Sequence, residues 1–168
     1  MSTTQERYDL DGHESVTLAI LDLVNQYPGL LDGDSIKFGM PDEDNGKAMT
    51  PISSGIIATE REDVTGRVVQ ICNYPFYVVS RTGSLSNALK ISAKEWLDDL
   101  GKWLEKQAIV VNGETFKLDE YPQLTGAREF ISIERQTPAF LETMQEGQIE
   151  NWSIYITAQY RNEFLKED

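Results

Sequence analysis

The sequence predicts an α+β fold, with an antiparallel or mixed β-sheet and two main helices packed on one of its faces. Two segments, residues 13–26 and 85–104, show the apolar spacing of amphipathic helices. Most other apolar residues fall into about six short stretches of strand composition that follow one another in hairpin order. Hairpins in series, without alternating helices, are typical of α+β domains. The 168 residues suit a single domain over 1–168.

The first element is the helix expected over residues 13–26. Asp11 and Glu14 stand three positions apart, the spacing of a capping box with Asp11 as the cap. Pro28 and Gly29 end the helix. Its apolar face is formed by Val16, Ala19, Ile20, Leu23, Val24 and Tyr27.

A short strand and a hairpin follow. Residues 35–39 have strand composition, and residues 40–51 are expected to form a mobile acidic loop. Residues 52–60 and 67–81 are rich in Ile, Val, Tyr and Phe with turn residues between them, which predicts a β-hairpin. Because proline cannot donate to a strand ladder, Pro75 marks a bulge, a bend or a sheet edge.

The second helix has the most regular pattern in the chain. Ser84 is its expected cap, and about five turns follow with one apolar face. That face comprises Leu85, Leu89, Ala93, Trp96, Leu97, Leu100, Trp103 and Leu104. Residues 109–118 then predict two short strands around an Asn112-Gly113 turn, the strongest short hairpin signal in the sequence.

Two longer strands are expected at residues 129–135 and 149–162. In the second, apolar residues alternate with polar ones, which indicates a strand with one buried face. The apolar set is Trp152, Ile154, Ile156, Ala158 and Tyr160. Residues 137–147 fit either a strand or one helical turn. The two ends, 1–10 and 163–168, are expected to be flexible and frayed, respectively.

The chain is strongly acidic, with 15 Lys and Arg against 28 Asp and Glu and a net charge of −13. Such a surface repels nucleic-acid phosphate and anionic lipid unless a local basic cluster outweighs it. The densest basic stretch, residues 90–106, interleaves lysines with carboxylates, as a solvated helix face does. We therefore expect no specific binding to nucleic acid and no membrane partner.

The compartment is indicated by the first residues and by the cysteine content. Residues 1–10 lack the basic start and apolar stretch of a secretory signal, and no apolar run approaches the ~18 residues of a membrane span. The one cysteine, Cys72, lies in an apolar run and is expected to be a buried small hydrophobe. A reducing cytosol is the expected compartment.

No residue pattern in the sequence indicates a catalytic, cofactor-binding or metal site. The single histidine, His13, is expected to be exposed near a helix start, and Cys72 has no neighbouring cation to activate its thiol. The paired carboxylates Asp98 with Asp99 and Glu142 with Glu146 fit solvated faces better than acid/base pairs.

The acidic segment 41–46 is superficially similar to a calcium loop. Its glycine is fifth from Asp42 instead of sixth, and Ser53 stands at the twelfth position, where an EF-hand has glutamate. Neither a P-loop nor a G-x-G-x-x-G pattern occurs. We expect no cofactor, no metal and no enzyme activity.

Aromatic and arginine side chains are the candidates for protein contacts, because both are enriched at interfaces. The candidate interface residues are Arg135, Phe140, Tyr155 and Arg161. Tyr155 and Trp152 are three positions apart on the last strand, so their side chains lie on opposite faces. A second subunit could cover the face that carries Tyr155. Core packing under a loop explains Tyr155 equally well.

The run from Phe130 to Arg161, FISIERQTPAFLETMQEGQIENWSIYITAQYR, and the opening helix with its LVNQYP cluster carry a family resemblance. In element order and texture they resemble the small minor capsid or tail terminator proteins of long-tailed phages and of phage-tail-like particles from Gram-positive bacteria. The resemblance covers most of the chain. The segments 40–51 and 62–66 have no counterpart in it.

This resemblance implies a viral structural protein of the virion that forms a hexameric ring on the head-proximal end of the tail tube. The ring stops tube growth and joins the head connector or collar and, in a contractile particle, the sheath. Its location would be the tail neck, after assembly in the bacterial host cytoplasm. DNA would pass through an acidic lumen without specific binding.

A ring requires two different patches on each subunit. The hairpin 52–81 and the last strand are the expected patches, through pairing of their edges across subunits. A head–tail stopper or other neck protein is the alternative within virions. From a different class, a small cytosolic acidic enzyme or an inhibitor that mimics nucleic acid remains open.

Overall fold

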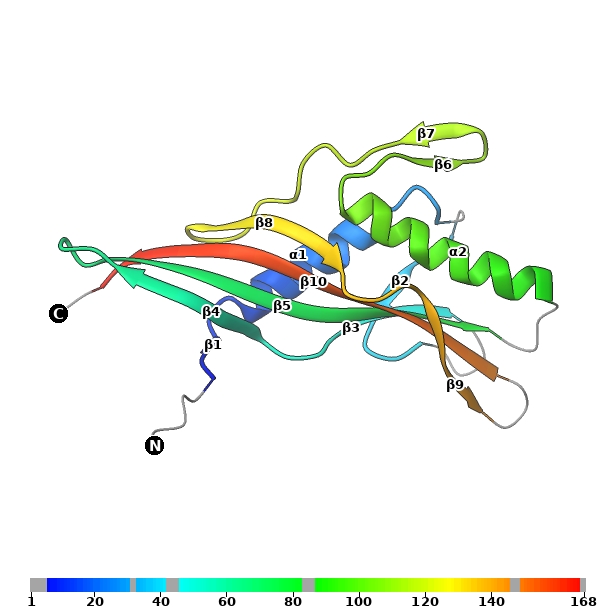
Figure 1. The fold of residues 1–168 in the computed structure, drawn as a ribbon, viewed down its shortest axis with the longest axis horizontal. Coiled ribbons are helices and arrows are strands. Elements are labelled where there is room, and N and C mark those ends of the chain that lie inside the picture. The colour runs from blue at the N-terminus through cyan, green and yellow to red at the C-terminus, as the bar shows by residue number, and fades with distance from the viewer. Residues whose placement is uncertain (1–5, 31–32, 42–45, 83–86, 146–148, 167–168) are drawn as a thin grey trace.

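The computed structural model describes residues 6–30, 33–41, 46–82, 87–145 and 149–166 (Figure 1). Within these residues the chain forms two helices and a mostly antiparallel main sheet, so the predicted α+β class is confirmed. The helices are α1 (His13–Val24) and α2 (Asn87–Leu104). The strands are β1 (Tyr8–Asp9), β2 (Ile36–Phe38), β3 (Gly46–Pro51), β4 (Gly55–Glu62), β5 (Arg67–Thr82), β6 (Ile109–Val111), β7 (Glu114–Phe116), β8 (Arg128–Arg135), β9 (Phe140–Gln145) and β10 (Ile149–Leu165).

The long strands β5 and β10 form the centre of the main sheet. Their antiparallel register runs unbroken from Glu150 opposite Thr82 to Leu165 opposite Arg67. The main path is β1-β4-β5-β10-β8, while β3 also pairs with β5 and β9 with β10. Because β2 runs parallel to β3, the sheet is mixed. The strands β6 and β7 form a separate hairpin.

Alternation along β5 and β10 gives the sheet one buried face. The register places Tyr74 opposite Ala158 and Val78 opposite Ile154, so the buried residues of both strands share that face. The shared set is Cys72, Tyr74, Phe76, Val78, Ile154, Ile156, Ala158 and Tyr160. The period-two pattern predicted for the last strand is confirmed from Ile154 to Tyr160. It is wrong at the start of the predicted alternation, where Ser153 is fully buried and Trp152 only partly buried.

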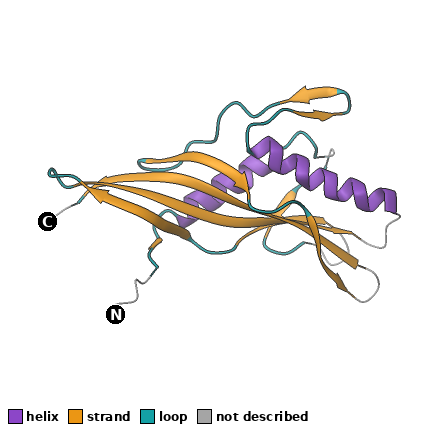
Figure 2. Cartoon of the chain, in the orientation of Figure 1, coloured by secondary structure: helices purple, strands orange, loops and turns teal. Residues whose placement is uncertain are grey.

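Both helices pack on this buried face, as predicted (Figure 2). The fully buried helix residues include Val16, Ile20 and Leu23 of α1 and Leu97, Leu100 and Leu104 of α2. Each such side chain stabilises the fold by about 1.5–3 kcal/mol. Tyr27 meets Trp96 edge-on at 5.2 Å between ring centroids, and Trp96 Nε1 donates to the Gly29 carbonyl oxygen at 2.8 Å. These contacts join the end of α1 to the middle of α2.

Pro75 lies where β5 changes its partner strand. On that side β4 pairs with β5 as far as Asn73, and β3 pairs with it from Phe76 onward. The Pro75 carbonyl oxygen accepts a hydrogen bond at 2.9 Å from the N–H of Ile52, in the connection between β3 and β4. In an antiparallel pair the N–H and C=O groups of one residue face the same neighbouring strand. The N–H group that Pro75 lacks would therefore have faced the connection between β3 and β4, where no ladder hydrogen bond is lost. β5 is thus a central strand, and the proline marks an interruption in its pairing.

The start of α1 differs from the prediction. The residue before the helix is Gly12, and no side chain caps it, so the capping box expected at Asp11 and Glu14 is wrong. The backbone N–H of Gly12 donates to Asp9 Oδ1 at 3.2 Å. An aspartate two positions earlier than expected therefore holds the entry to the helix.

Four segments are more ordered than the sequence indicates. Tyr8 and Asp9, expected within a flexible N-terminus, form β1 and pair with β4. Residues 46–51, expected within a mobile loop, form β3 because β5 extends beyond β4 and offers a free ladder. Residues 140–145, which the sequence left open, form β9. Residues 163–165 complete β10 instead of belonging to a frayed tail, and Lys166 N–H donates to the Gly66 carbonyl oxygen at 2.8 Å.

The predicted Asn112-Gly113 hairpin is confirmed. Both residues have positive φ angles, 51° and 82°, as a tight turn between β6 and β7 requires. Some predictions concern residues outside those described by the structure: the flexibility of residues 1–5, the mobility of residues 42–45, Ser84 as the cap and Leu85 on the face of the second helix, and Glu146 as the partner of Glu142.

Candidate interaction surface

The face of the main sheet opposite the helices forms an open surface. We call it the open face and define it by the odd-numbered side chains of β5 from Val69 to Tyr77 and of β10 from Tyr155 to Glu163, with their neighbours on β4, β8 and β9. Register pairs Asn73 with Gln159, Pro75 with Thr157 and Tyr77 with Tyr155 across the two strands, and all six residues are half-buried. Among the residues that the structure describes, no helix covers this side (Figure 2).

Aromatic rings gather on the part of the open face near β9. The ring centroids of Tyr77 and Tyr155 lie 5.9 Å apart, and Phe140 meets Tyr155 nearly edge-on at 5.6 Å. Such ring pairs contribute about 0.5–1.5 kcal/mol beyond their burial. Tyr155 therefore belongs to an ordered cluster in which Phe140 and Tyr77 fix its ring.

Glu142 is held beside this cluster by two hydroxyl groups. Tyr155 Oη donates to Glu142 Oε1 and Ser153 Oγ donates to Glu142 Oε2, each at 2.6 Å. The hydrogen bond to Glu142 raises the pKa of Tyr155. Glu142 is itself exposed, and within the described part of the chain it forms no ion pair. Its carboxylate is thus fixed in position and free to meet a cation.

The other part of the open face carries a hollow of about 480 Å³, which is lined by Thr59, Arg61, Val69, Ile71, Arg161 and Glu163. In the strand register Arg61 lies opposite Val69, and Arg161 lies opposite Ile71. Arg161 pairs with Glu129 at 3.1 Å and with Glu163 at 3.4 Å. Arg61 forms no ion pair with any described residue.

The predicted interface residues divide between the two sides of the sheet. Phe140, Tyr155 and Arg161 lie on the open face. Arg135 lies on the helix side, where its Nε and Nη2 donate to Glu105 at 3.0 Å and its aliphatic chain lies against Gly101 of α2. These contacts join α2 to β8.

The expected edge pairing through the last strand is wrong. β10 pairs with β5 on one side and with β8 and β9 on the other, so it has no free edge over most of its length. The outer edge of β8 is also engaged, because Ile133 N–H donates to Tyr121 Oη at 3.3 Å and Arg135 N–H donates to Glu105 at 2.9 Å. The face of the sheet, not these edges, is left for contacts.

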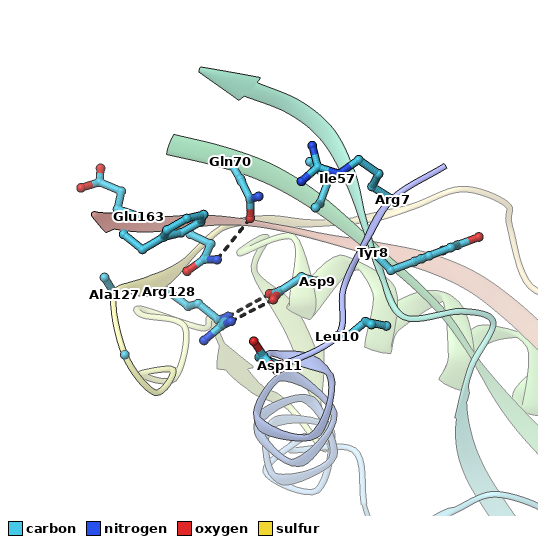
Figure 3. Close-up of a pocket in the computed structure, with 13 residues that line it drawn as sticks. Arg7, Tyr8, Asp9, Leu10, Asp11, Ile57, Gln70, Ala127, Arg128 and Glu163 are labelled. Atoms are coloured by element: carbon cyan, nitrogen blue, oxygen red, sulfur yellow. Dashed lines mark hydrogen bonds and ion pairs between the residues drawn. The ribbon is translucent and has the colours of Figure 1, made fainter. Parts of the chain in front are cut away.

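A second hollow, of about 530 Å³, lies between the N-terminal segment and the ends of β5 and β10 (Figure 3). At its base Arg128 donates to Asp9 twice, from Nε and Nη2, each at 2.8 Å. Tyr160 Oη donates to Asp9 Oδ2 at 2.7 Å, and the Gly12 N–H makes a fourth bond. Four donors use the full accepting capacity of a carboxylate. This cluster is therefore a structural junction without a free group for chemistry.

The electrostatics of the junction follow from its hydrogen bonds. Burial alone would raise the pKa of Asp9, but the bonds from Arg128 and Tyr160 outweigh it, and the pKa lies below its ordinary value. Burial, together with the bond to Asp9, raises the pKa of Tyr160. Asp9 is thus an anion and Tyr160 a neutral donor at neutral pH.

Cys72 and His13 lie in the core and at its border, respectively. Burial raises the pKa of the Cys72 thiol to about 11, so it is protonated and buried, as predicted. His13, expected to be exposed, is half-buried with its ring 5.8 Å from that of Tyr74. The described residues contain no group of three or more His, Cys, Asp or Glu side chains placed to hold a metal ion.

Glu142 and Arg61 belong to one surface that the sequence pattern does not reveal. Glu142 belongs to a segment whose conformation the sequence left open, and Arg61 lies beyond the predicted end of its strand at residue 60. The alternation of Thr59 and Arg61 is the signal that could have placed Arg61 on the open face.

The chain has little similarity to known protein families. No family model matches it, and no curated protein matches it. Among solved structures, a chain from the virion of a native gene transfer agent particle is similar at 13% sequence identity, with a TM-score of 0.46. The similarity covers 93% of this chain and 100% of that one. None of the described helices is both long enough and apolar enough to cross a membrane.

Proposed function

We propose that the chain is a structural protein of a phage-like virion, a tail terminator that closes the head-proximal end of the tail tube. The observation that carries the proposal is the open face: the sheet is covered by helices on one side, and on the other it presents uncharged and aromatic pairs at its centre, between an arginine end and a carboxylate end. In a chain of net charge −13, the uncharged centre of this face is where a protein neighbour can approach without strong repulsion.

The sequence resemblance of residues 130–161 to tail terminators supplies the identity of the assembly. Its partners would be further copies of the chain in a hexameric ring, the tube protein, and the head connector or collar. A contractile particle would add the sheath protein. The ring would lie in the tail neck after assembly in the host cytoplasm.

The polar clusters support a role based on shape. Hydrogen bonds from Arg128, Tyr160 and the Gly12 N–H saturate the Asp9 carboxylate and join β1, β8, β10 and the start of α1. Arg135 and Glu105 similarly join β8 to the end of α2. These side chains make the subunit rigid, which a ring of fixed geometry requires.

The acidic charge has a use in such a ring. If the lumen is lined by carboxylates, duplex DNA finds no cations to replace its counterions and passes without being retained. DNA is therefore a passenger in this proposal and not a ligand.

Purified chain mixed with tail tubes of the same particle tests the proposal by electron microscopy. A terminator adds density at one end of each tube, and tubes polymerised in its presence are shorter. Density along the tube or no binding would contradict the proposal. Binding to connector rings but not to tubes would instead identify a head–tail stopper.

A further inference from the structure

The open face carries opposite charges at its two ends. Arg161 and Tyr155 are six residues apart on β10, which corresponds to about 20 Å. Arg61 and Arg161 flank the hollow at one end, and Glu142 is bonded to Tyr155 at the other. The paired residues between them on β5 and β10, from Asn73 opposite Gln159 onward, are uncharged.

The arginine end is suited to accept a carboxylate. Arg61 has a planar fork of donors and no ion-pair partner among the described residues, and the floor beneath it is formed by Val69 and Ile71. A carboxylate that enters this hollow can form paired hydrogen bonds with Arg61 beside an apolar floor.

Glu142, at the other end of the open face, is suited to supply such a carboxylate. Glu142 is exposed, and its position is fixed by Ser153 and Tyr155. Each of its oxygens accepts one of these two hydrogen bonds and keeps capacity for another. A fixed side chain loses little conformational entropy on binding, which favours its use at an interface.

We propose that neighbouring copies of the chain associate head to tail through the open face, with Glu142 of one copy in the Arg61–Arg161 hollow of the next. The aromatic cluster around Tyr155 would pack beside this ion pair. The inference rests on the proposed function, because it is the ring that requires each copy to offer two different patches.

Charge complementarity favours a second copy over other partners. Both halves of the pair occur on the same face of one chain, so copies complement each other. Nucleic acid is disfavoured because the acidic chain repels phosphate. Arg161 is already paired with Glu129 and Glu163, so Arg61 is the cation of the hollow that is left to meet Glu142. A two-fold dimer would use both ends on one partner, whereas head-to-tail contact leaves one end of each kind free to close a ring.

Two charge reversals, Arg61→Glu and Glu142→Arg, test the contact by sedimentation velocity over a range of concentrations. Each variant alone should associate at least about tenfold more weakly than the natural chain, since each opposes like charges. A one-to-one mixture should recover association, because the carboxylate introduced at position 61 of one variant then meets the guanidinium introduced at position 142 of the other.

Lys117→Glu is the matched control. It changes the net charge by the same amount as Arg61→Glu, at an exposed position after β7 that has no ion pair among the described residues. It should associate like the natural chain. A thermal melt of each variant, followed by circular dichroism, checks that the fold is kept.

The outcomes separate this inference from the proposed function. A natural chain that stays monomeric at every concentration, an Arg61→Glu variant that associates like Lys117→Glu, a mixture that does not recover, or a closed dimer would each overturn the head-to-tail contact. A chain that caps tubes while failing these tests retains its proposed function. A chain that passes them but does not bind tube ends loses it.

Discussion

Tyr160 donates a hydrogen bond of 2.7 Å to Asp9 across 151 positions of sequence, and so connects the last strand to the first. The same carboxylate accepts hydrogen bonds from Nε and Nη2 of Arg128. The side chain of Arg128 is 14% exposed and that of Asp9 is 5% exposed. One buried anion therefore fixes the N-terminal segment, the start of α1 and the β8 and β10 strands in a single arrangement.

Replacing Asp9 by Asn should strongly destabilise the fold. The substitution leaves the Arg128 guanidinium largely buried without its counter-charge, which typically costs about 3–5 kcal/mol. Urea unfolding measures the loss. Glu60→Gln, which removes an exposed pair with Arg7, is the control and should cost far less. Equal losses in the two variants would show that the junction is not the stronger contact.

Stability should fall in acid with a contribution from Asp9. Its pKa is depressed in the folded chain, so the contribution is fully present above the unfolded pKa of about 4 and disappears as the pH falls through the folded pKa. Unfolding free energies measured between neutral pH and strong acid should therefore fall more steeply for the natural chain than for Asp9→Asn. Parallel curves would contradict the depressed pKa.

Gly55→Ala should be destabilising because a Cβ at position 55 would overlap Tyr160, most severely at its hydroxyl oxygen. Overpacking of this kind costs about 1–3 kcal/mol. The double variant with Tyr160→Phe lacks that oxygen, so its loss should be smaller than the sum of the two single losses. Strict additivity in denaturant unfolding would rule out the overlap.

Tyr155→Phe should weaken association of copies while leaving the fold unchanged. The ring keeps its contacts with Phe140 and Tyr77, but Glu142 loses one of its two hydroxyl donors. Loss of one such bond, worth about 0.5–1.5 kcal/mol, corresponds to a reduction of about two- to tenfold. Sedimentation measures it, with the thermal melt as the reference. Unchanged association would show that the tyrosine hydroxyl does not position Glu142.

Cys72 should resist alkylation in the native chain. Its pKa of about 11 and its burial leave almost no accessible thiolate at a pH of about 8. Iodoacetamide labelling followed by mass spectrometry should show slow modification in buffer and rapid modification in urea. Fast labelling of the native chain would mean that the core around β5 opens readily.

The helices and central strands were predictable because their signals are local. Period-two alternation at residues 154–160 and helical spacing at residues 96–104 each indicate a buried face without knowledge of the neighbours. The Asn112-Gly113 turn is similarly local, since its two positive φ angles favour those residues.

The sheet order and the interaction surface depend on long-range contacts that no local pattern contains. Residues 46–51 form a strand because β5 is long enough to pair with both β3 and β4. Asp9 holds the start of α1 because Arg128 and Tyr160, far along the chain, fix its carboxylate. Arg135 was expected at an interface for its residue type, but its register opposite Ile156 directs it toward α2.

We propose that this chain acts by packing its open face against further copies at the head-proximal end of a tail tube. A cryo-electron microscopy map of the intact particle should show a ring at that end, in which Glu142 of each copy lies against Arg61 of the next. A map that places the chain elsewhere in the particle, or leaves the open faces uncovered, would contradict it.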